Sequence, residues 1–224
     1  MESWWRIDWI ATVLQAAPRI AALRRHMRPT IRLNGIDTLD AAVMKAFGVR
    51  GVMWDVDGTL MRRHGTAVAP HLAQAFARLA GDPALCHVIL SNCDERRFVQ
   101  LASIFPTIPI IRAYATDRGL IVRRRIGDDD TWSDVRPMHH QRPTGALRKP
   151  SLAIFRVALE ALEGVSPAHA LMVGDQYLTD IAPANMLGVI TVKVNTVEPR
   201  SFPVAVRALQ MAERVLFSLS PSRH

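Results

Sequence analysis

The chain has 224 residues, of which 49% are hydrophobic, and this suits one α/β domain with additions better than two domains. The formal net charge of +8 indicates an anionic partner, which can be a phosphate ester, an anionic lipid surface or nucleic acid. A specific reader of nucleic acid is disfavoured, because the sequence has no zinc-finger spacing and only 6% aromatic residues. Cys86 and Cys93 lack disulfide or metal spacing, which predicts a reduced, cytoplasmic protein.

Residues 1–33 form an amphipathic N-terminal segment rich in tryptophan and arginine. Polar residues interrupt it before any apolar run reaches the roughly 18 residues that span a bilayer. Two interpretations are open: a helix in the interface of an anionic membrane, with the protein peripheral there, or a helix packed on the protein's own core. The residues concerned are Trp4, Trp5, Trp9, Arg19, Arg24, Arg25 and Arg28.

Residues 34–200 alternate between helical and strand patterns. A short helix is expected over residues 39–47, and the apolar run 51–54 after it reads as a buried parallel strand. This strand ends in Asp55-Val56-Asp57-Gly58-Thr59, at the place where open α/β sheets bind ligands. Because side chains alternate along the chain, Asp55 and Asp57 can point to one side. Two such carboxylates repel each other unless a cation or a proton lies between them.

The Asp-x-Asp spacing suits phosphoryl transfer. One carboxylate can attack phosphorus while the other gives a proton to the leaving oxygen, and a hard divalent cation such as Mg²⁺ offsets the negative charge. The hydroxyl of Thr59 can brace the loop. The alternative is an ordinary surface Asp-x-Asp-Gly turn, which the apolar residues before Asp55 disfavour.

The next helix is expected over residues 70–80, and the strand over residues 87–90 ends in Ser91-Asn92. A serine hydroxyl and backbone N–H groups where a strand leads into a helix, here 94–104, can bind a phosphate oxygen. Ser-Asn is also an ordinary helix cap. We interpret Cys93 as a bystander, since the carboxylates already supply a nucleophile.

A further strand is expected over residues 108–114, and a hairpin or flap near the site over about 115–148. Within that insertion His139 and His140 are interpreted as solvated loop residues. Pro150 suits the first position of a helix that runs to about residue 163. Lys149, directly before it, can direct a compact positive charge at a phosphate or at the nucleophile, although a lysine at such a place is more often a surface residue.

The strand expected over residues 170–173 again leads into carboxylates. Asp175 can complete the oxygen shell of a magnesium ion begun by Asp55, and Asp180 can bind that ion through water or orient the lysine. Residues 189–192 supply a fifth strand, and residues 201–224 form a C-terminal helix and tail. The pattern predicts an α/β fold, Rossmann-like, with a parallel sheet of about five strands and helices on both faces.

The ordered motifs resemble those of the haloacid dehalogenase (HAD) superfamily, whose phosphatases are Mg²⁺-dependent. The resemblance implies a HAD-like phosphatase domain over residues 34–200 and a phosphoric monoester hydrolase. It makes Asp55 the nucleophile, Asp57 the general acid and base, and Lys149 the charge stabiliser. It makes Ser91 the hydroxyl that binds the phosphate, and Thr59 and Asn92 are further expected substrate contacts. The metal ligands that it implies are Asp55, Asp175 and the main-chain carbonyl of Asp57, and Asp180 is a further candidate ligand from its position after the strand.

Within the superfamily, Gly174-Asp175-Gln176 with Asp180, and Arg148-Lys149-Pro150, are similar to the small-capped group (subfamily IIIA) that includes phosphatidylglycerophosphate phosphatases. That resemblance favours phosphatidylglycerophosphate or a related phospholipid phosphate as substrate. A HAD phosphatase acting on a soluble sugar phosphate or nucleotide is one alternative. A non-catalytic, membrane-binding scaffold is the other.

Overall fold

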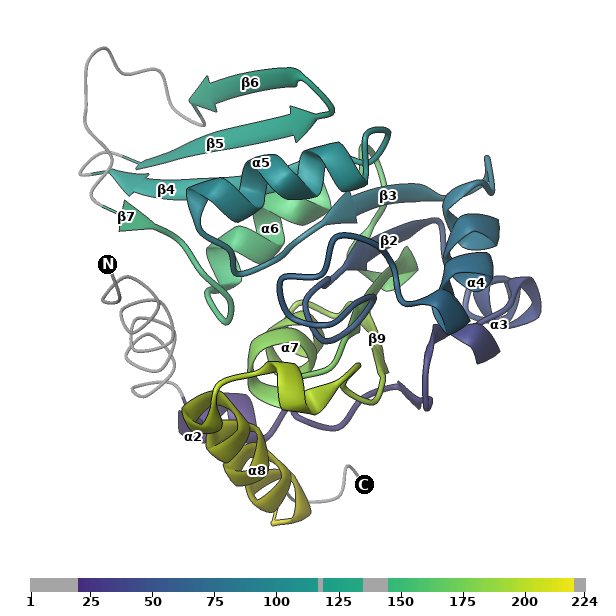
Figure 1. Ribbon diagram of the computed structural model, residues 1–224, viewed down its shortest axis with the longest axis vertical. Coiled ribbons are helices and arrows are strands. Elements are labelled where there is room, and N and C mark those ends of the chain that lie inside the picture. The colour runs from purple at the N-terminus through teal and green to yellow at the C-terminus, as the bar shows by residue number, and fades with distance from the viewer. Residues whose placement is uncertain (1–19, 117–118, 135–144, 220–224) are drawn as a thin grey trace.

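The computed structural model describes residues 20–116, 119–134 and 145–219 (Figure 1). Two interpretations made from sequence fall outside these ranges. They concern the membrane or core role of the tryptophans near the N-terminus and the loop role of the adjacent histidines. Both stay predictions, and the residues concerned are Trp4, Trp5, Trp9, His139 and His140.

A mixed sheet of nine strands, counted over the described ranges, forms the centre of the protein. Its order is β1-β9-β8-β2-β3-β4-β5-β6, with β7 paired to β4. The pairs from β1 to β4 are parallel, whereas β5, β6 and β7 join antiparallel. The bounds are β1 Ile31–Arg32, β2 Gly51–Trp54, β3 Cys86–Ile89, β4 Ile110–Thr116, β5 Gly119–Ile126, β6 Asp129–Asp134, β7 Gly145–Ala146, β8 Ala170–Gly174 and β9 Ile190–Lys193.

The helices cover both faces of this sheet, which confirms the predicted α/β, Rossmann-like class. Alternate residues of β2 show the two layers: Trp54 packs in a core cluster with Leu72 and Phe98, whereas Met53 packs in a second cluster with Phe155. The bounds are α2 Ile20–Arg24, α3 Ala41–Ala46, α4 Pro70–Ala80, α5 Glu95–Ile104, α6 Leu152–Glu160, α7 Ala182–Met186 and α8 Val204–Ser218.

The central strands β2 and β8 align their carboxyl ends at one edge of the sheet. All residues of both strands are buried, as apolar parallel strands between two helical layers require. Trp54, the last residue of β2, pairs with Val173 of β8 and with Ile89 of β3. The residues that follow these three strands therefore emerge side by side.

The sheet has more strands than the about five predicted, because short and edge strands have weak sequence patterns. β1 and β7 have two residues each, and β5 and β6 form an edge hairpin with many charged residues, partly buried along β5 and mostly exposed along β6. The hairpin extends the sheet at its edge beyond β4 (Figure 1). A role for the 115–148 insertion as a flap stays a prediction, as does the division of the chain at residues 33 and 200.

The helix expected to begin at Pro150 begins two residues later. Arg148–Ser151 forms a turn in which the Ser151 N–H donates to the Arg148 carbonyl at 2.9 Å, and α6 starts at Leu152. This turn, not a helix start, carries Lys149. In the part of the chain that the structure describes, no helix combines the length and apolar character needed to cross a membrane.

Candidate functional site

Three carboxylates and one lysine gather at the carboxyl end of the central strands. Asp55 follows β2, Asp175 follows β8, and Asp180 lies in the π-type turn Tyr177–Ile181. Lys149 reaches the same place from the turn before α6. All four side chains are buried, with at most 6% of any residue exposed, so their charges must be compensated by one another or by a ligand.

The ammonium group of Lys149 bridges two of these carboxylates. Its Nζ donates to Asp55 Oδ1 and to Asp180 Oδ1, each at 2.6 Å. Burial by itself lowers the pKa of Lys149, but the charges of Asp180 and Asp55 outweigh it and raise that pKa above its ordinary value. The lysine is therefore a fixed positive charge in contact with Asp55.

Asn92 holds the main chain of this lysine. The Lys149 N–H donates to Asn92 Oδ1 at 2.8 Å, and Asn92 Nδ2 donates to the Lys149 carbonyl at 3.0 Å. Asn92 was predicted to bind substrate, and that role stays a prediction. What the structure adds is a link from the loop after β3 to the turn that presents the lysine.

Each carboxylate is also oriented by a hydrogen bond at its other oxygen. The Thr59 hydroxyl, predicted to contact substrate, donates to Asp55 Oδ2 at 2.8 Å. The Gln176 N–H donates to Asp180 Oδ2 at 3.0 Å. On the third carboxylate, Asp175 Oδ2 accepts from the Thr196 hydroxyl at 2.7 Å.

The carboxylates fit a divalent metal ion. One oxygen from each of Asp55, Asp175 and Asp180 lies within 4.8 Å of the others, and Asp175 Oδ1 is buried without a hydrogen-bond partner among the described residues. Burial, reinforced by the Asp55 and Asp180 charges, raises the pKa of Asp175 to about 7, and burial also raises the pKa of Asp180 to about 6. Oxygen ligands with excess negative charge suit Mg²⁺.

Asp57, predicted as the general acid and base, pairs with a buried arginine. Arg97 Nη2 lies 2.5 Å from Asp57 Oδ1, and the His64 N–H donates to the same oxygen at 3.2 Å. Arg97 also donates to the Gly65 carbonyl at 2.7 Å and to Gln100 Oε1 at 2.6 Å. The side chain of Asp57 is not in the carboxylate cluster found over the described ranges, so metal contact through its main-chain carbonyl stays a prediction.

Two glycines allow the close packing of this site. Gly58 has φ +97°, and a Cβ there would lie 2.9 Å from Asp175 Oδ2 and 3.0 Å from Phe202 Cζ. A Cβ on Gly174 would lie 2.5 Å from the Asp180 side chain. Any larger residue at either position would displace a carboxylate.

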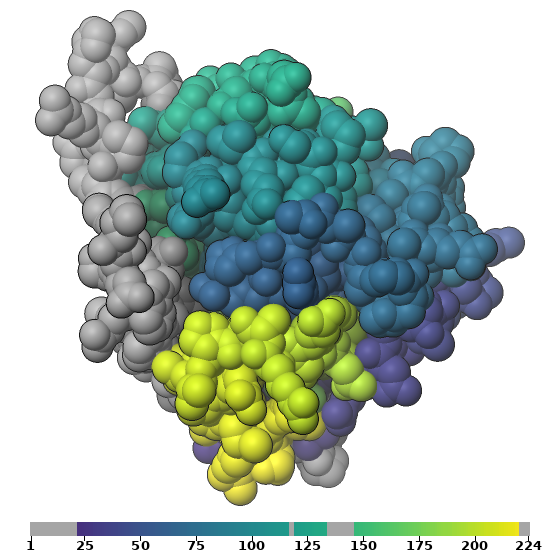
Figure 2. Space-filling model, in the orientation of Figure 1, coloured from purple at the N-terminus to yellow at the C-terminus, as the bar shows by residue number. Residues whose placement is uncertain are grey.

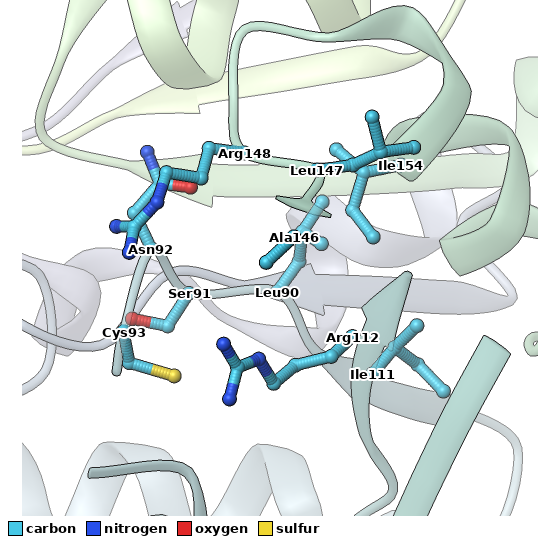
Figure 3. Close-up of a pocket in the computed structure, with 10 residues that line it drawn as sticks. All are labelled: Leu90, Ser91, Asn92, Cys93, Ile111, Arg112, Ala146, Leu147, Arg148 and Ile154. Atoms are coloured by element: carbon cyan, nitrogen blue, oxygen red, sulfur yellow. The ribbon is translucent and has the colours of Figure 1, made fainter. Parts of the chain in front are cut away.

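Ser91, predicted to bind substrate, lines a small pocket beside the Lys149 turn (Figure 3). Figure 3 shows the guanidinium groups of Arg112 and Arg148 on the same side of the pocket as Ser91 and Asn92. The arrangement can receive an anionic oxygen, although Arg112 also pairs with Glu95 at 2.7 Å. The remaining lining residues are Leu90, Cys93, Ile111, Ala146, Leu147 and Ile154.

Sequence reasoning missed two residues of this site. Thr196 follows β9, so the rule that polar residues after parallel strands meet at one edge would have found it. Arg97 has no such signal, because nothing local distinguishes it from Arg96, its exposed neighbour in α5. Cys93 was interpreted as a bystander; burial raises the pKa of its thiol to about 12, which disfavours the thiolate.

Comparison with known proteins adds three findings. A family model described as HAD-hydrolase-like matches residues 146–200. Phosphatidylglycerophosphate phosphatase 1, chloroplastic/mitochondrial, of Arabidopsis thaliana is 23% identical over 195 residues, which are 86% of this chain and 48% of that protein. The chain thus spans about half the length of this curated relative. The crystal structure of an uncharacterized protein from Listeria monocytogenes serotype 4b aligns with a TM-score of 0.41 and 19% identity, over 76% of this chain and 99% of that chain.

The matched segment holds three of the four residues of the buried cluster. Residues 146–200 include Lys149, Asp175 and Asp180, and the structure brings Asp55, at the end of β2, into contact with them. The family match over residues 146–200 and the Arabidopsis relative thus support a haloacid dehalogenase superfamily phosphatase, the family that the order of the motifs resembles.

Proposed function

We propose that this protein is a magnesium-dependent phosphatase that hydrolyses a phosphomonoester through an aspartyl-phosphate at Asp55. The observation that carries the proposal is the 2.6 Å contact between Lys149 Nζ and Asp55 Oδ1 inside a buried cluster with Asp175 and Asp180. A carboxylate beside a fixed ammonium group, with further carboxylates for a cation, is suited to attack an anionic phosphate group.

The first half-reaction transfers the phosphoryl group to the protein. An oxygen of Asp55 forms a bond to phosphorus, and the bond from phosphorus to the ester oxygen breaks. Asp57 in its protonated form gives its proton to that leaving oxygen, so that an alcohol departs. Lys149 offsets the negative charge that the phosphate brings next to Asp55.

The second half-reaction returns the protein to its first state. Asp57, now a carboxylate, takes a proton from water while the water oxygen bonds to phosphorus. The bond from phosphorus to Asp55 breaks, inorganic phosphate leaves, and Asp57 is again protonated. Arg97, which contacts Asp57, keeps that carboxyl group in place between the two steps.

Asp55, Asp175 and Asp180, with the main-chain carbonyl of Asp57, would hold the Mg²⁺ ion. When bound, Mg²⁺ supplies positive charge that lowers the repulsion between the carboxylates and the phosphate. The unpartnered Asp175 Oδ1 is the oxygen of the described cluster that is left for such an ion.

The favoured substrate is phosphatidylglycerophosphate or a related phospholipid phosphate, met by a cytoplasmic protein peripheral to the membrane. Support comes from the name of the Arabidopsis relative and from the net charge of +8, which suits an anionic lipid surface. A soluble sugar phosphate or nucleotide is the alternative substrate class. A non-catalytic scaffold is disfavoured, because four charged residues that the proposed chemistry uses, Asp55, Lys149, Asp175 and Asp180, lie together in one buried cluster.

The test is hydrolysis by the full chain of phosphatidylglycerophosphate in detergent micelles, glycerol 3-phosphate and a nucleoside monophosphate, with Mg²⁺ or with EDTA. We expect phosphate release from the lipid, lost in EDTA and restored by Mg²⁺. Asp55→Asn keeps the side-chain shape but removes the nucleophile, so activity should fall roughly 10⁴-fold or more. Acid-trapped aspartyl-phosphate should form in the native protein and not in this variant.

Each other result has a definite meaning. A preference for the soluble esters would move the assignment to the alternative substrate class. Full activity without metal would reject the magnesium requirement. Substantial turnover by Asp55→Asn would reject the mechanism, and failure of every ester would favour the scaffold.

A further inference from the structure

The outward face of α8 is apolar. Val204, Met211, Val215 and the next residue after the helix, Leu219, are 77%, 61%, 53% and 60% exposed. Their spacings of seven, four and four residues place them along one side of the helix. Over the described ranges seven large apolar side chains are exposed, and these four are the only ones that lie together on one helix face. Scattered exposed apolar residues are ordinary, but a continuous stripe marks an interaction surface.

The opposite face attaches α8 firmly to the body of the protein. Glu213 and Gln210 are buried there, and Glu213 accepts a hydrogen bond from the Tyr177 N–H at 3.2 Å. Phe217 stacks on the Tyr177 ring with 4.3 Å between centroids. The helix thus has a well-packed inner face, so its exposed stripe does not result from poor docking.

Positive charge accompanies the stripe. Arg207 and Arg214 are exposed on α8, and the one acidic residue of the helix, Glu213, faces inward. Arg200 in the preceding turn is exposed as well, and none of these three arginines forms an ion pair with the residues that the structure describes. An apolar stripe edged by arginine, on a helix that exposes no acidic residue, is typical of helices that lie on anionic membranes; the exposed Glu198 lies before the helix, in the turn that also carries Arg200.

The start of α8 lies close to the loop after β2 that carries Asp57 and Gly58. The Arg63 N–H donates to Ser201 Oγ at 3.1 Å, and the Val197 N–H donates to the Gly58 carbonyl at 2.7 Å. Phe202 packs against Gly58, two residues before α8 starts. Figure 2 shows the yellow C-terminal segment against the blue segment that holds this loop. A partner surface that contacts the outer face of α8 would therefore also lie next to the loop that carries Asp57.

We propose that the outer face of α8 docks the protein on an anionic lipid bilayer and so brings the site to a phosphate in the head-group region. The link to a lipid substrate rests on the proposed function, whereas the docking does not. Self-association through this face is disfavoured, because Arg207 and Arg214 of one copy would meet no exposed acidic residue on α8 of the other.

The first experiment measures sedimentation of the full chain with phosphatidylcholine vesicles, with and without phosphatidylglycerol. We expect binding to the anionic vesicles that falls with added salt. Met211→Ser with Val215→Ser, and separately Arg207→Gln with Arg214→Gln, should each lower the partition coefficient at least about tenfold. The matched control is Phe47→Ser, which removes an exposed apolar side chain on a different element and should change nothing.

Melting temperature and hydrolysis of a small soluble ester show whether each variant is folded. The arginine pair leaves all packing unchanged, so it tests the surface even if the serine variant unfolds. Vesicle binding at the native level by both double variants would overturn the proposal. An equal loss of vesicle binding in Phe47→Ser would overturn it as well. So would a dimer, seen by ultracentrifugation, that Met211→Ser dissociates. If a chain that starts at residue 20 shows the binding and the full chain does not, the N-terminal segment covers this face and the proposal fails.

The two proposals fail separately. If the chain sediments with anionic vesicles but hydrolyses no phosphate ester, the docking surface stands and the proposed function is rejected. If hydrolysis of the lipid in detergent is normal and the α8 variants sediment as the native chain does, only the docking surface is rejected.

Discussion

Arg97 Nη2 lies 2.5 Å from Asp57 Oδ1, so a buried arginine 40 residues away in sequence fixes the proposed general acid and base. We expect Arg97→Gln to lower kcat by about tenfold to a hundredfold, because a mispositioned acid transfers its proton poorly. The pH–rate profile should change, since the charge beside Asp57 is lost. A merely structural role would lower the melting temperature without moving that profile.

The control for this prediction is Arg96→Gln, which changes the exposed neighbour in α5 and should leave kcat and the pH profile unchanged. In the Asp57→Asn background, Arg97→Gln should cost little further activity, because the group it positions is already gone. Independent, additive losses would contradict the assignment.

Replacing Lys149 tests the central charge of the site. Lys149→Met should lower kcat about 10²-fold to 10³-fold, since Asp55 and Asp180 then face each other without the ammonium group that lies 2.6 Å from both. Lys149→Arg should not restore the rate, because a planar guanidinium group does not fit the place of a compact ammonium group. Recovery of near-native turnover in the arginine variant would show that charge alone is sufficient.

Magnesium affinity should depend on pH. Burial and neighbouring charges raise the pKa of Asp175 to about 7 in the metal-free protein, so below that pH a proton must leave before the ion binds. We expect affinity, measured by calorimetry, to rise between pH 6 and pH 8 by at most about tenfold per pH unit. Proton release should appear as a dependence of the heat on the buffer. A constant affinity across this range would contradict the prediction.

Glu213 should make the protein less stable as pH rises. Burial, with the charges of Asp180 and Asp175 nearby, raises the pKa of Glu213 from its ordinary 4.5 to about 8. The folded state thus prefers the protonated form, so the stability it contributes is full below about pH 4.5 and is lost as pH rises through 8. Glu213→Gln should match the native melting temperature at pH 4.5 and exceed it at pH 8.5, measured in EDTA.

The same comparison with Glu163→Gln, at an exposed glutamate, should show no such divergence with pH. If Glu213→Gln is less stable than the native protein at pH 8.5, its carboxylate is stabilising in the fold and the direction of the shift is wrong.

The sequence could predict those site residues that follow a buried strand. Asp55 and Asp175 come directly after β2 and β8. The apolar runs of these strands predict buried parallel strands, whose carboxyl ends lie at the same edge of the sheet. Lys149 could be assigned a role only from its position in the motif order, because locally it resembles a surface lysine. The contact of Lys149 with Asp55 depends on how the turn before α6 is held.

Features set by tertiary contacts could not be predicted. Arg97 reaches Asp57 across the packed loop, and its pattern within α5 is that of any helical arginine. The strands β5 and β6 lie in the insertion for which a hairpin or flap was predicted, but their charged side chains gave no strand pattern from which bounds could be set. Apolar residues occur on both sides of α8, so the sequence does not show which side faces the protein. The structure shows that the side with Gln210 and Glu213 is buried.

The strands on either side of the insertion, β4 before it and β7 after it, pair with each other in the sheet. Tyr114 of β4 pairs with Ala146 of β7, and Leu147 N–H donates to the Ala113 carbonyl at 2.7 Å. Together with the bonds between Asn92 and Lys149, this closure anchors the lysine independently of the residues between 116 and 145. The exposed side chains of β6, such as Trp132, can therefore change during evolution while the reactive centre keeps its geometry, whereas Val122 of β5 is held by its place in the core cluster with Met53.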